Sequence, residues 1–252
     1  MHTPSPVRQY GLIGKKLGHS FSRRYFTEKF EREGIAAQYD LFELADIGDL
    51  PGLLVSRPQL AGLNVTIPYK TEIIPLLHAL TPEAAAIGAV NTVHIHSGRL
   101  IGHNTDALGF HQSMLRFLGS ERPAGALVLG TGGASKAVVY ALENWMQLPV
   151  QRVSRRAQPG ILAYEDLHAD LLRQFPLIVN TTPLGMYPDI DSAPQLPYEV
   201  LGPAHWICDL VYNPARTLLM HRAAMQGARV CNGLDMLIFQ AEAAWTLWSR
   251  PV

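Results

Sequence analysis

The sequence predicts an α/β protein built around mostly parallel β-sheet. Short apolar, β-rich runs alternate with amphipathic helical stretches along the whole chain, which is the pattern of βαβ units. One of these runs ends in a glycine-rich turn at Gly130, directly before a helical stretch. The chain has 252 residues, enough for one large or two modest domains at roughly 100–200 residues per domain.

The expected elements can be placed in order along the chain. Strands are expected at residues 9–14, 38–43, 62–67, 126–130, 149–154, 177–180, 206–211 and 229–231. Helices are expected at residues 23–33, 106–118, 135–147, 217–226 and 233–250. Residues 91–95 and 99–103 flank Ser97-Gly98 and predict a β-hairpin. A polar turn at residues 119–123 precedes a fresh strand, so we expect a domain boundary between residues 106 and 124.

Composition narrows the class of protein. With 21 basic and 21 acidic residues, the net charge is zero and gives no long-range attraction to nucleic acid or anionic membranes. No apolar run approaches the roughly 20 residues that span a bilayer. Cys208 and Cys231 form neither a CxxC pair nor a disulfide framework, as in a reducing compartment. We therefore expect a cytoplasmic α/β protein without nucleic-acid or membrane partners.

The glycine-rich turn suggests a dinucleotide site. Residues 126–135 are an apolar strand, a turn with Gly130, Gly132 and Gly133, and a helix start. Glycines let the backbone approach a pyrophosphate, whose charge the free N–H groups of the following helix stabilise. Ser135 stands where the G-x-G-x-x-G pattern has its third glycine, so a tight turn without a ligand is the alternative interpretation.

The end of the next strand favours NADP over NAD. Ser154-Arg155-Arg156 begins 24 residues after Gly130. An NAD site would place an acidic residue there for the ribose 2′-hydroxyl, whereas the 2′-phosphate of NADP needs positive charge. Arginine is planar and permanently cationic, which suits a phosphate. A solvated basic turn is the alternative.

Polar residues in the first half also stand where loops are expected. Ser20 and Ser22 share the loop after the first strand, and Ser22 also suits the N-cap of the helix at 23–33. Lys70 stands at a helix start, where the macrodipole disfavours a cation, so it is a candidate functional group as well as a candidate surface lysine. Asp106 begins another helix as an N-cap or first-turn acid. Both helices follow strands, so Lys70 and Asp106 are expected at one rim of the sheet.

Two patterns are interpreted as non-catalytic. Tyr25-x-x-x-Lys29 matches the Tyr/Lys pair of short-chain dehydrogenases, but that pair follows the glycine turn, whereas this one precedes it by about a hundred residues. It is interpreted as an ordinary i,i+4 pair on an amphipathic helix. His94, His96 and His103 lack a cysteine or carboxylate at convincing ligand spacing, so no metal site is expected.

Eight short motifs occur in a fixed order along nearly the whole chain. They cover residues 19–22, 64–70, 88–92, 102–106, 130–134, 180–186, 209–214 and 232–234, the last followed by Gln240. Together they resemble the shikimate dehydrogenase family. The resemblance implies a substrate-binding catalytic domain at residues 1–106, completed by a C-terminal helix at 232–252, and a Rossmann-like NADP-binding domain at 107–231. It implies reversible reduction of 3-dehydroshikimate to shikimate, in chorismate and aromatic amino acid biosynthesis, by a monomer or homodimer.

The resemblance also implies roles for individual residues. Lys70 would be the catalytic acid and base, with Asp106 beside it. The substrate carboxylate would be held by Ser20 and Ser22, helped by Tyr212, and the ring hydroxyls by Thr66, Asn91, Asp106 and Gln240. The residues implied for NADP are Gly130, Thr131, Gly132, Gly133, Ala134, Ser154, Arg155, Arg156, Thr181, Leu210 and Gly233.

Three alternative functions compete with this one. A quinate or quinate/shikimate dehydrogenase using NAD tends to carry threonine at the second serine and an acid at the strand end, and Ser22 and Arg155 argue against both. A non-catalytic dinucleotide sensor would lose the Lys/Asp pair, but Lys70 and Asp106 are both present. A folate-handling dehydrogenase would leave the two serines without a purpose.

Overall fold

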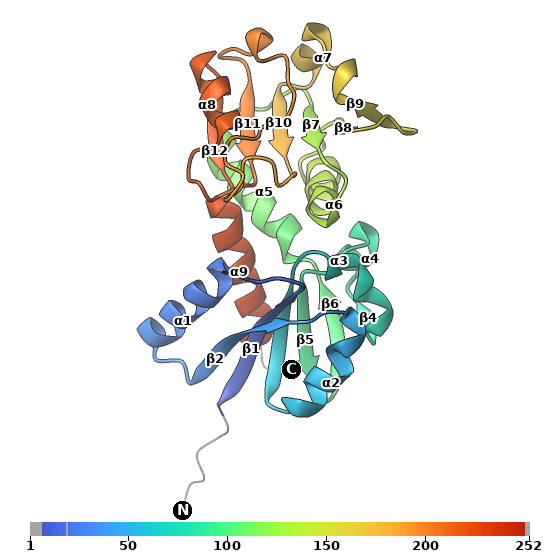
Figure 1. Cartoon of the computed structure of the whole chain (residues 1–252), viewed down its shortest axis with the longest axis vertical. Helices are drawn as coiled ribbons and strands as arrows, with labels where there is room; N and C mark the ends of the chain where they lie inside the picture. Colours follow the sequence, from blue (N-terminus) through green and yellow to red (C-terminus); the bar gives the residue numbers. More distant parts are fainter. Residues whose placement is uncertain (1–6, 19, 250–252) are drawn as a thin grey trace, which may run out of the picture. The chain divides into compact units, whose positions relative to one another are not determined.

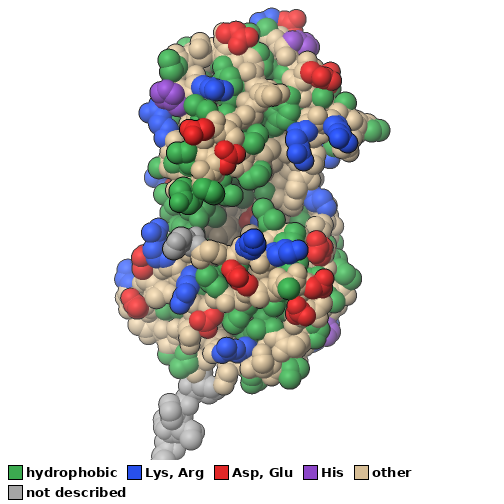
Figure 2. All heavy atoms as spheres, viewed as in Figure 1, with side chains coloured by type: hydrophobic (Ala, Val, Ile, Leu, Met, Phe, Trp, Pro, Cys, Tyr) green, Lys and Arg blue, Asp and Glu red, His purple; other side chains and the backbone are tan. Residues whose placement is uncertain are grey.

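The computed structural model describes residues 7–18 and 20–249, so His19 of the first motif lies outside the described residues. Contacts divide the chain into two compact units, the first from residues 1–105 and 241–252 and the second from residues 106–240. Within the described ranges, every helix is too short or too polar to cross a membrane. Figure 2 shows acidic and basic side chains interspersed on the visible face, consistent with the zero net charge.

The first unit contains a mixed sheet with the strand order β2-β1-β3-β5-β6-β4 (Figure 1). Strand β1, second from one edge, runs parallel to β2 and β3, whereas β3 and β5 are antiparallel. Strands β5 and β6 form the expected hairpin, and Ser97 and Gly98 turn with φ of 48° and 75°. The strands are β1 (Arg8–Gly14), β2 (Ala37–Glu43), β3 (Leu60–Val65), β4 (Ala79–Leu80), β5 (Thr92–His96) and β6 (Arg99–His103).

Helices cover both faces of this first sheet. On one face, Phe26 and Phe30 of α1 and Trp248 of α9 pack against Tyr10 and Tyr39. On the other face, residues of α2, α3 and α4 join a second apolar cluster. Helix α1 ends at Gly34, which adopts the left-handed conformation typical of a helix C-cap. The helices are α1 (Phe21–Glu33), α2 (Leu50–Ser56), α3 (Tyr69–Glu72), α4 (Pro82–Ile87) and the last part of α9 (Leu234–Ser249).

The second unit contains an all-parallel, Rossmann-like sheet in the order β12-β11-β10-β7-β8-β9. Strands β7, β10 and β11 are buried along their whole length, as expected for a parallel sheet covered on both faces. The chain leaves β7 toward β8 and returns to β10 on the other side, so the ligand-binding switch point lies at the carboxyl ends of β7 and β10. The strands are β7 (Ala126–Leu129), β8 (Val150–Ser154), β9 (Ile161–Ala163), β10 (Leu177–Asn180), β11 (Trp206–Asp209) and β12 (Arg229–Asn232).

Helices of the second unit largely follow the sequence expectation. Residues of α7 and α8, including Leu172 and Leu219, pack on the sheet in one apolar cluster. The expected helix at 135–147 is helical as far as Trp145, since α6 passes at Ala141 into a short π-helical turn, and it ends before Gln147, which has a positive φ of 55°. The helices are α5 (Thr105–Leu118), α6 (Gly133–Tyr140), α7 (Ala169–Gln174), α8 (Leu218–Met225) and the first part of α9.

We predict that the first unit loses stability in mild acid. Burial and the charge of neighbouring His94 lower the pKa of His103, whose Nε2 is buried without a hydrogen-bond partner among the described residues. Burial, His96 and Arg8 likewise lower the pKa of His94. The unfolded chain therefore binds protons that the folded protein excludes, and the free energy of unfolding falls as pH drops below 6.5.

Urea unfolding at several pH values tests this, with His103→Leu as the comparison. The variant has one titrating group fewer, so its unfolding free energy is expected to depend less steeply on pH. Parallel pH profiles for the wild type and the variant would contradict the prediction.

Candidate functional site

The two loop serines lie at the start of helix α1. The helix begins at Phe21, so Ser20 occupies the N-cap position, in an extended conformation and without a side-chain cap hydrogen bond. The prediction of Ser22 as N-cap is wrong, since Ser22 is the second residue of the helix. Its side chain instead interacts with the hydroxyl of Tyr39 on β2, where it lowers the pKa of that hydroxyl against the larger effect of burial.

The Ser22 contact is one end of a buried polar network. Tyr39 donates to Asn64 Oδ1 at 2.7 Å, and Asn64 Nδ2 donates to Thr92 Oγ1 at 3.2 Å. Tyr39, Asn64 and Thr92 are each at most 4% exposed. Buried polar groups are costly without partners, so each side chain holds the next one in place.

The other end of this network orients Asn91. Thr92 Oγ1 lies 3.0 Å from Thr105 Oγ1, and the Thr105 amide donates to Asn91 Oδ1 at 2.6 Å. Asn91 Nδ2 in turn donates to Thr105 Oγ1 at 3.0 Å. The hydrogen bonds therefore run without a break from Tyr39 to Asn91, a residue that the sequence predicted for substrate binding. Sequence reasoning did not assign a role to Tyr39, Thr92 or Thr105.

Lys70 lies beside this network. It is half-buried on the short helix α3, whose neighbouring Tyr69 donates its hydroxyl to the Leu44 carbonyl at 2.7 Å. The Val90 amide donates to the Lys70 carbonyl at 2.7 Å, so α3 runs next to the segment that carries Asn91. Thr66 stands just before α3, and its amide donates to the Ile13 carbonyl of β1.

Asp106 and Gln240 occupy helices that touch backbone to backbone. Asp106 is in the first turn of α5 and is 5% exposed, and Gln240 of α9 is 6% exposed. One turn after Asp106, a Cβ at Gly109 would lie 2.8 Å from the Gln240 amide nitrogen and 2.7 Å from the Met236 carbonyl. Only glycine allows this approach, which holds Gln240 near the start of α5.

The glycine turn at the end of β7 leaves room for an anion. Gly130 has a φ of 109°, and a Cβ there would lie 2.6 Å from Thr181 Oγ1, so only glycine fits. A Cβ at Gly132 would meet nothing within 4 Å, and no side chain of the described residues caps the N-terminus of α6 at Gly133. The first N–H groups of α6 are therefore available to a phosphate, and Thr131 and Ala134 flank this cradle.

Ser135 explains the missing third glycine. Its hydroxyl donates to the Gly130 carbonyl at 2.7 Å and closes the turn from inside the first turn of α6. Ser135 is 2% exposed, so its side chain does not occupy the open side of the glycine turn. The departure from the G-x-G-x-x-G pattern is therefore compatible with a dinucleotide.

The end of β8 carries exposed positive charge beside the glycine turn. The Gly130 amide donates to the Val153 carbonyl at 2.8 Å, which fixes the following Ser154 near the turn. Ser154 accepts a hydrogen bond from the Arg156 amide at 3.4 Å and thereby shapes the strand end. Arg155 and Arg156 are exposed, and neither is ion-paired with a carboxylate of the described chain. The donors and charges fit the pyrophosphate and 2′-phosphate of NADP.

A buried carboxylate that the sequence analysis left without a role organises the ends of β10 and β11. Asp209 is fully buried and accepts hydrogen bonds from Asn180 at 2.9 Å, Thr217 at 2.6 Å and the Val211 amide at 3.1 Å. Burial raises its pKa, and these hydrogen bonds oppose that shift. The sequence signal that could have identified Asp209 is an acidic residue at the end of a fully apolar strand. The network fixes the loop that carries Leu210.

Gly233 and Tyr212 flank this loop. A Cβ at Gly233 would lie 2.1 Å from the Leu210 carbonyl oxygen, so the backbone of α9 starts in direct contact with Leu210. Thr181, at the end of β10, donates its hydroxyl to the Leu129 carbonyl at 2.6 Å. The second unit thus brings Gly130, Thr181, Leu210 and Gly233 to the carboxyl edge of its sheet. Tyr212 is half-buried two residues after Leu210.

Comparison with known proteins finds shikimate dehydrogenases both as a family model and as sequence relatives. A family model described as the shikimate dehydrogenase substrate binding domain matches residues 12–93. A shikimate dehydrogenase (NADP(+)) of Moorella thermoacetica is 39% identical over 259 residues, covering 94% of this chain and 86% of the relative. One of Desulforamulus reducens is 33% identical over 262 residues, covering 95% and 89%.

Solved structures share the fold over nearly the whole chain. The Thermus thermophilus shikimate 5-dehydrogenase in complex with NADP(H) and shikimate matches with a TM-score of 0.84 and 34% identity, covering 96% of this chain and 93% of that chain. A quinate dehydrogenase from Corynebacterium glutamicum in complex with NAD matches with a TM-score of 0.86 and 28% identity, covering 96% and 94%.

The polar network makes a prediction about stability. Tyr39→Phe removes the hydroxyl that satisfies Asn64 Oδ1, and the buried oxygen then lacks its 2.7 Å donor. We expect the free energy of unfolding in urea to fall by about 1–3 kcal/mol. Tyr187→Phe, at a tyrosine that is 66% exposed, is the control and is expected to leave it unchanged. Equal stability of Tyr39→Phe and the wild type would show that the Tyr39–Asn64 bond contributes nothing.

Proposed function

Because the chain belongs to the shikimate dehydrogenase family, we propose that it is an NADP-dependent dehydrogenase that reversibly reduces 3-dehydroshikimate to shikimate. The observation that carries this proposal is the 39% identity to a shikimate dehydrogenase (NADP(+)) over 94% of the chain. The step belongs to the route to chorismate and the aromatic amino acids. Residues 1–106 with 232–252 would bind the substrate, and residues 107–231 would bind NADP.

NADP would be held by the carboxyl edge of the second sheet. The turn from Gly130 to Ala134 and the uncapped start of α6 suit the pyrophosphate. Arg155 and Arg156 suit the 2′-phosphate, because their positive charge is exposed and not neutralised by a described carboxylate, and the Ser154 hydroxyl would add a hydrogen bond. Thr181, Leu210 and Gly233 would line the nicotinamide end. When bound, the cofactor supplies or accepts the hydride.

The substrate would be held by hydroxyl and amide groups. Ser20 and Ser22, with Tyr212, would donate hydrogen bonds to the carboxylate. Thr66, Asn91, Asp106 and Gln240 would bind the ring hydroxyls. The network from Tyr39 to Asn91 supports this assignment, since it fixes the Asn91 side chain before a ligand arrives. A site that is already ordered loses little conformational entropy on binding.

Lys70 would move the proton. Reduction of a ketone builds negative charge on its oxygen, so a proton donor must lie within hydrogen-bond reach. The Lys70 ammonium would give that proton, and the neutral amine would take it back in the oxidation of shikimate. Asp106 would orient the amine, so we assign it to positioning and not to strengthening a base.

The remaining expectations concern the binding partners of the protein and its cellular compartment. The proposed partners are small molecules, and the zero net charge offers no general attraction to nucleic acid. Cys208 and Cys231 are free, which suits the cytoplasm. We propose that the enzyme works there as a monomer or homodimer.

The direct test follows the absorbance of reduced nicotinamide with shikimate or quinate, each paired with NADP or NAD. We expect the fastest turnover with shikimate and NADP. Preference for quinate and NAD would instead support the quinate dehydrogenase alternative. Turnover in none of the four mixtures would support the non-catalytic sensor.

Replacing Lys70 tests its role as proton carrier. We expect Lys70→Ala to lower kcat by about 10²–10⁴-fold, because the ketone oxygen loses its acid. Lys70→Arg keeps the charge but cannot release a proton near neutral pH, so it is expected to fail as well. Shikimate affinity, measured by isothermal titration calorimetry, should change little in both variants. Wild-type turnover in Lys70→Ala would remove Lys70 from the mechanism.

Reversing the charge at Arg155 tests the cofactor assignment. In Arg155→Asp, a carboxylate would repel the 2′-phosphate and accept the free 2′-hydroxyl. We expect the ratio of kcat/KM for NADP over NAD to fall by about tenfold or more. Arg173→Asp, at an exposed arginine on α7, is the matched control and should preserve the ratio. An unchanged ratio in Arg155→Asp would show that the end of β8 does not bind the 2′-phosphate.

A further inference from the structure

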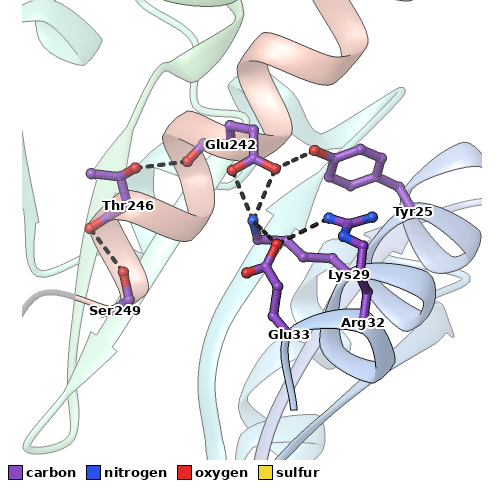
Figure 3. A network of polar contacts seen from close by, with 7 residues as sticks. All are labelled: Tyr25, Lys29, Arg32, Glu33, Glu242, Thr246 and Ser249. Carbon is purple, nitrogen blue, oxygen red and sulfur yellow. Dashed lines mark hydrogen bonds and ion pairs between the residues drawn. The ribbon is translucent and has the colours of Figure 1, made fainter. Parts of the chain in front are cut away.

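An ion-paired cluster joins helix α1 to the end of helix α9. Lys29 of α1 has a side chain that is only 7% exposed, and its Nζ lies 3.0 Å from both carboxylate oxygens of Glu242 (Figure 3). Glu33 lies 3.1 Å from the same Nζ, and the Tyr25 hydroxyl donates to Glu242 Oε1. Burial opposes the charge of Lys29, but its hydrogen bonds to Glu242 and Glu33 keep its pKa raised, so the ammonium stays charged. The sequence pattern had paired Tyr25 with Lys29, whereas both instead bind Glu242.

The cluster uses the face of α1 that carries a predicted substrate residue. Ser22, Tyr25 and Lys29 are separated by three and four residues, so they line one side of the helix. Ser22 stands in the first turn, and Tyr25 is one turn further along. The carboxylate of Glu242 is therefore held by the same helix face that presents Ser22.

A second contact anchors the same part of α9 to the sheet. Trp248 Nε1 donates to the Val93 carbonyl of β5 at 3.0 Å. Its indole occupies the space above Gly62, where a Cβ would lie 2.3 Å from Trp248 Nε1. Glu242 and Trp248 are six residues apart, nearly two turns of helix. The two contacts together fix this part of α9 to α1 and to β5, so the Glu242 carboxylate is held in place.

Glu242, Lys29, Tyr25 and Ser22 all belong to the first unit. We propose that Glu242 is a positioning residue for the substrate: by bridging Lys29 and Tyr25, it holds the face of α1 that presents Ser22 to the substrate. The inference rests on the proposed function, in which Ser22 binds shikimate. Glu242 touches neither substrate nor cofactor in this role and acts through α1.

Glu242→Gln tests the proposal because glutamine keeps the shape and removes the charge that holds Lys29. We expect KM for shikimate to rise about tenfold, with KM for NADP unchanged and kcat altered less than KM for shikimate. A general loss of folded protein would lower the apparent kcat and leave both KM values alone. Isothermal titration calorimetry with shikimate and with NADP tests, without turnover, whether the substitution weakens shikimate binding alone.

Tyr25→Phe is the milder variant and keeps the ion pair between Lys29 and Glu242. We expect a smaller rise in KM for shikimate, and no further rise when Tyr25→Phe is added to Glu242→Gln, since both act through one contact. Thr246→Ala is the matched control on α9, because among the described residues the Thr246 hydroxyl bonds only to the Glu242 carbonyl of its own helix. It should leave both KM values unchanged.

Three outcomes decide the matter. An unchanged KM for shikimate in folded Glu242→Gln, or equal rises in the two KM values, would overturn the proposal. If Glu242→Gln does not fold, Tyr25→Phe decides, and an unchanged KM for shikimate there would overturn it. Wild-type protein that fails to oxidise shikimate with NADP would overturn the proposed function instead, so the two failures can be told apart.

Discussion

The hydrogen bond from Tyr39 to Asn64, 2.7 Å long and buried, is the contact on which the first unit depends. A buried hydroxyl or amide without a partner is costly, so Tyr39 and Asn64 each hold a neighbour that would otherwise be free to rotate. Tyr39 interacts with Ser22, and Asn64 donates a hydrogen bond to Thr92, which in turn contacts Asn91. The requirement to satisfy buried polar atoms thus becomes an ordered set of hydroxyl and amide groups at one end of the sheet.

In the second unit, the same need to satisfy buried polar atoms acts at the carboxyl edge of a parallel sheet. Buried Asp209 draws Asn180, Thr217 and the Val211 amide around it, and this arrangement fixes the loop after β11. Close backbone contacts complete the edge, since Gly130 and Gly233 leave no room for a side chain. A fully apolar sheet with one buried carboxylate at its rim therefore presents rigid backbone and exposed charge to a ligand.

The sequence predicted what depends on local pattern. The α/β class, the parallel second sheet, the hairpin and the glycine turn are confirmed, because each follows from apolar period or turn residues. Helices α2, α3, α4 and α7 have seven residues or fewer, too short to show a helical period. The contact of Tyr25 with Glu242 crosses 217 residues of chain, and no local signal predicts it. The roles of Lys70 and Asp106 stay predictions.

A crystal structure of the enzyme with shikimate and NADP bound is the measurement that tests this account most directly. The account predicts Lys70 Nζ within about 2.6–3.2 Å of the oxygen that is oxidised, with Ser22 on the carboxylate and Asn91 on a ring hydroxyl. It also predicts the adenosine 2′-phosphate against Arg155. Shikimate bound away from Ser22 and Asn91, with Lys70 out of reach of the reacting oxygen, would contradict the account.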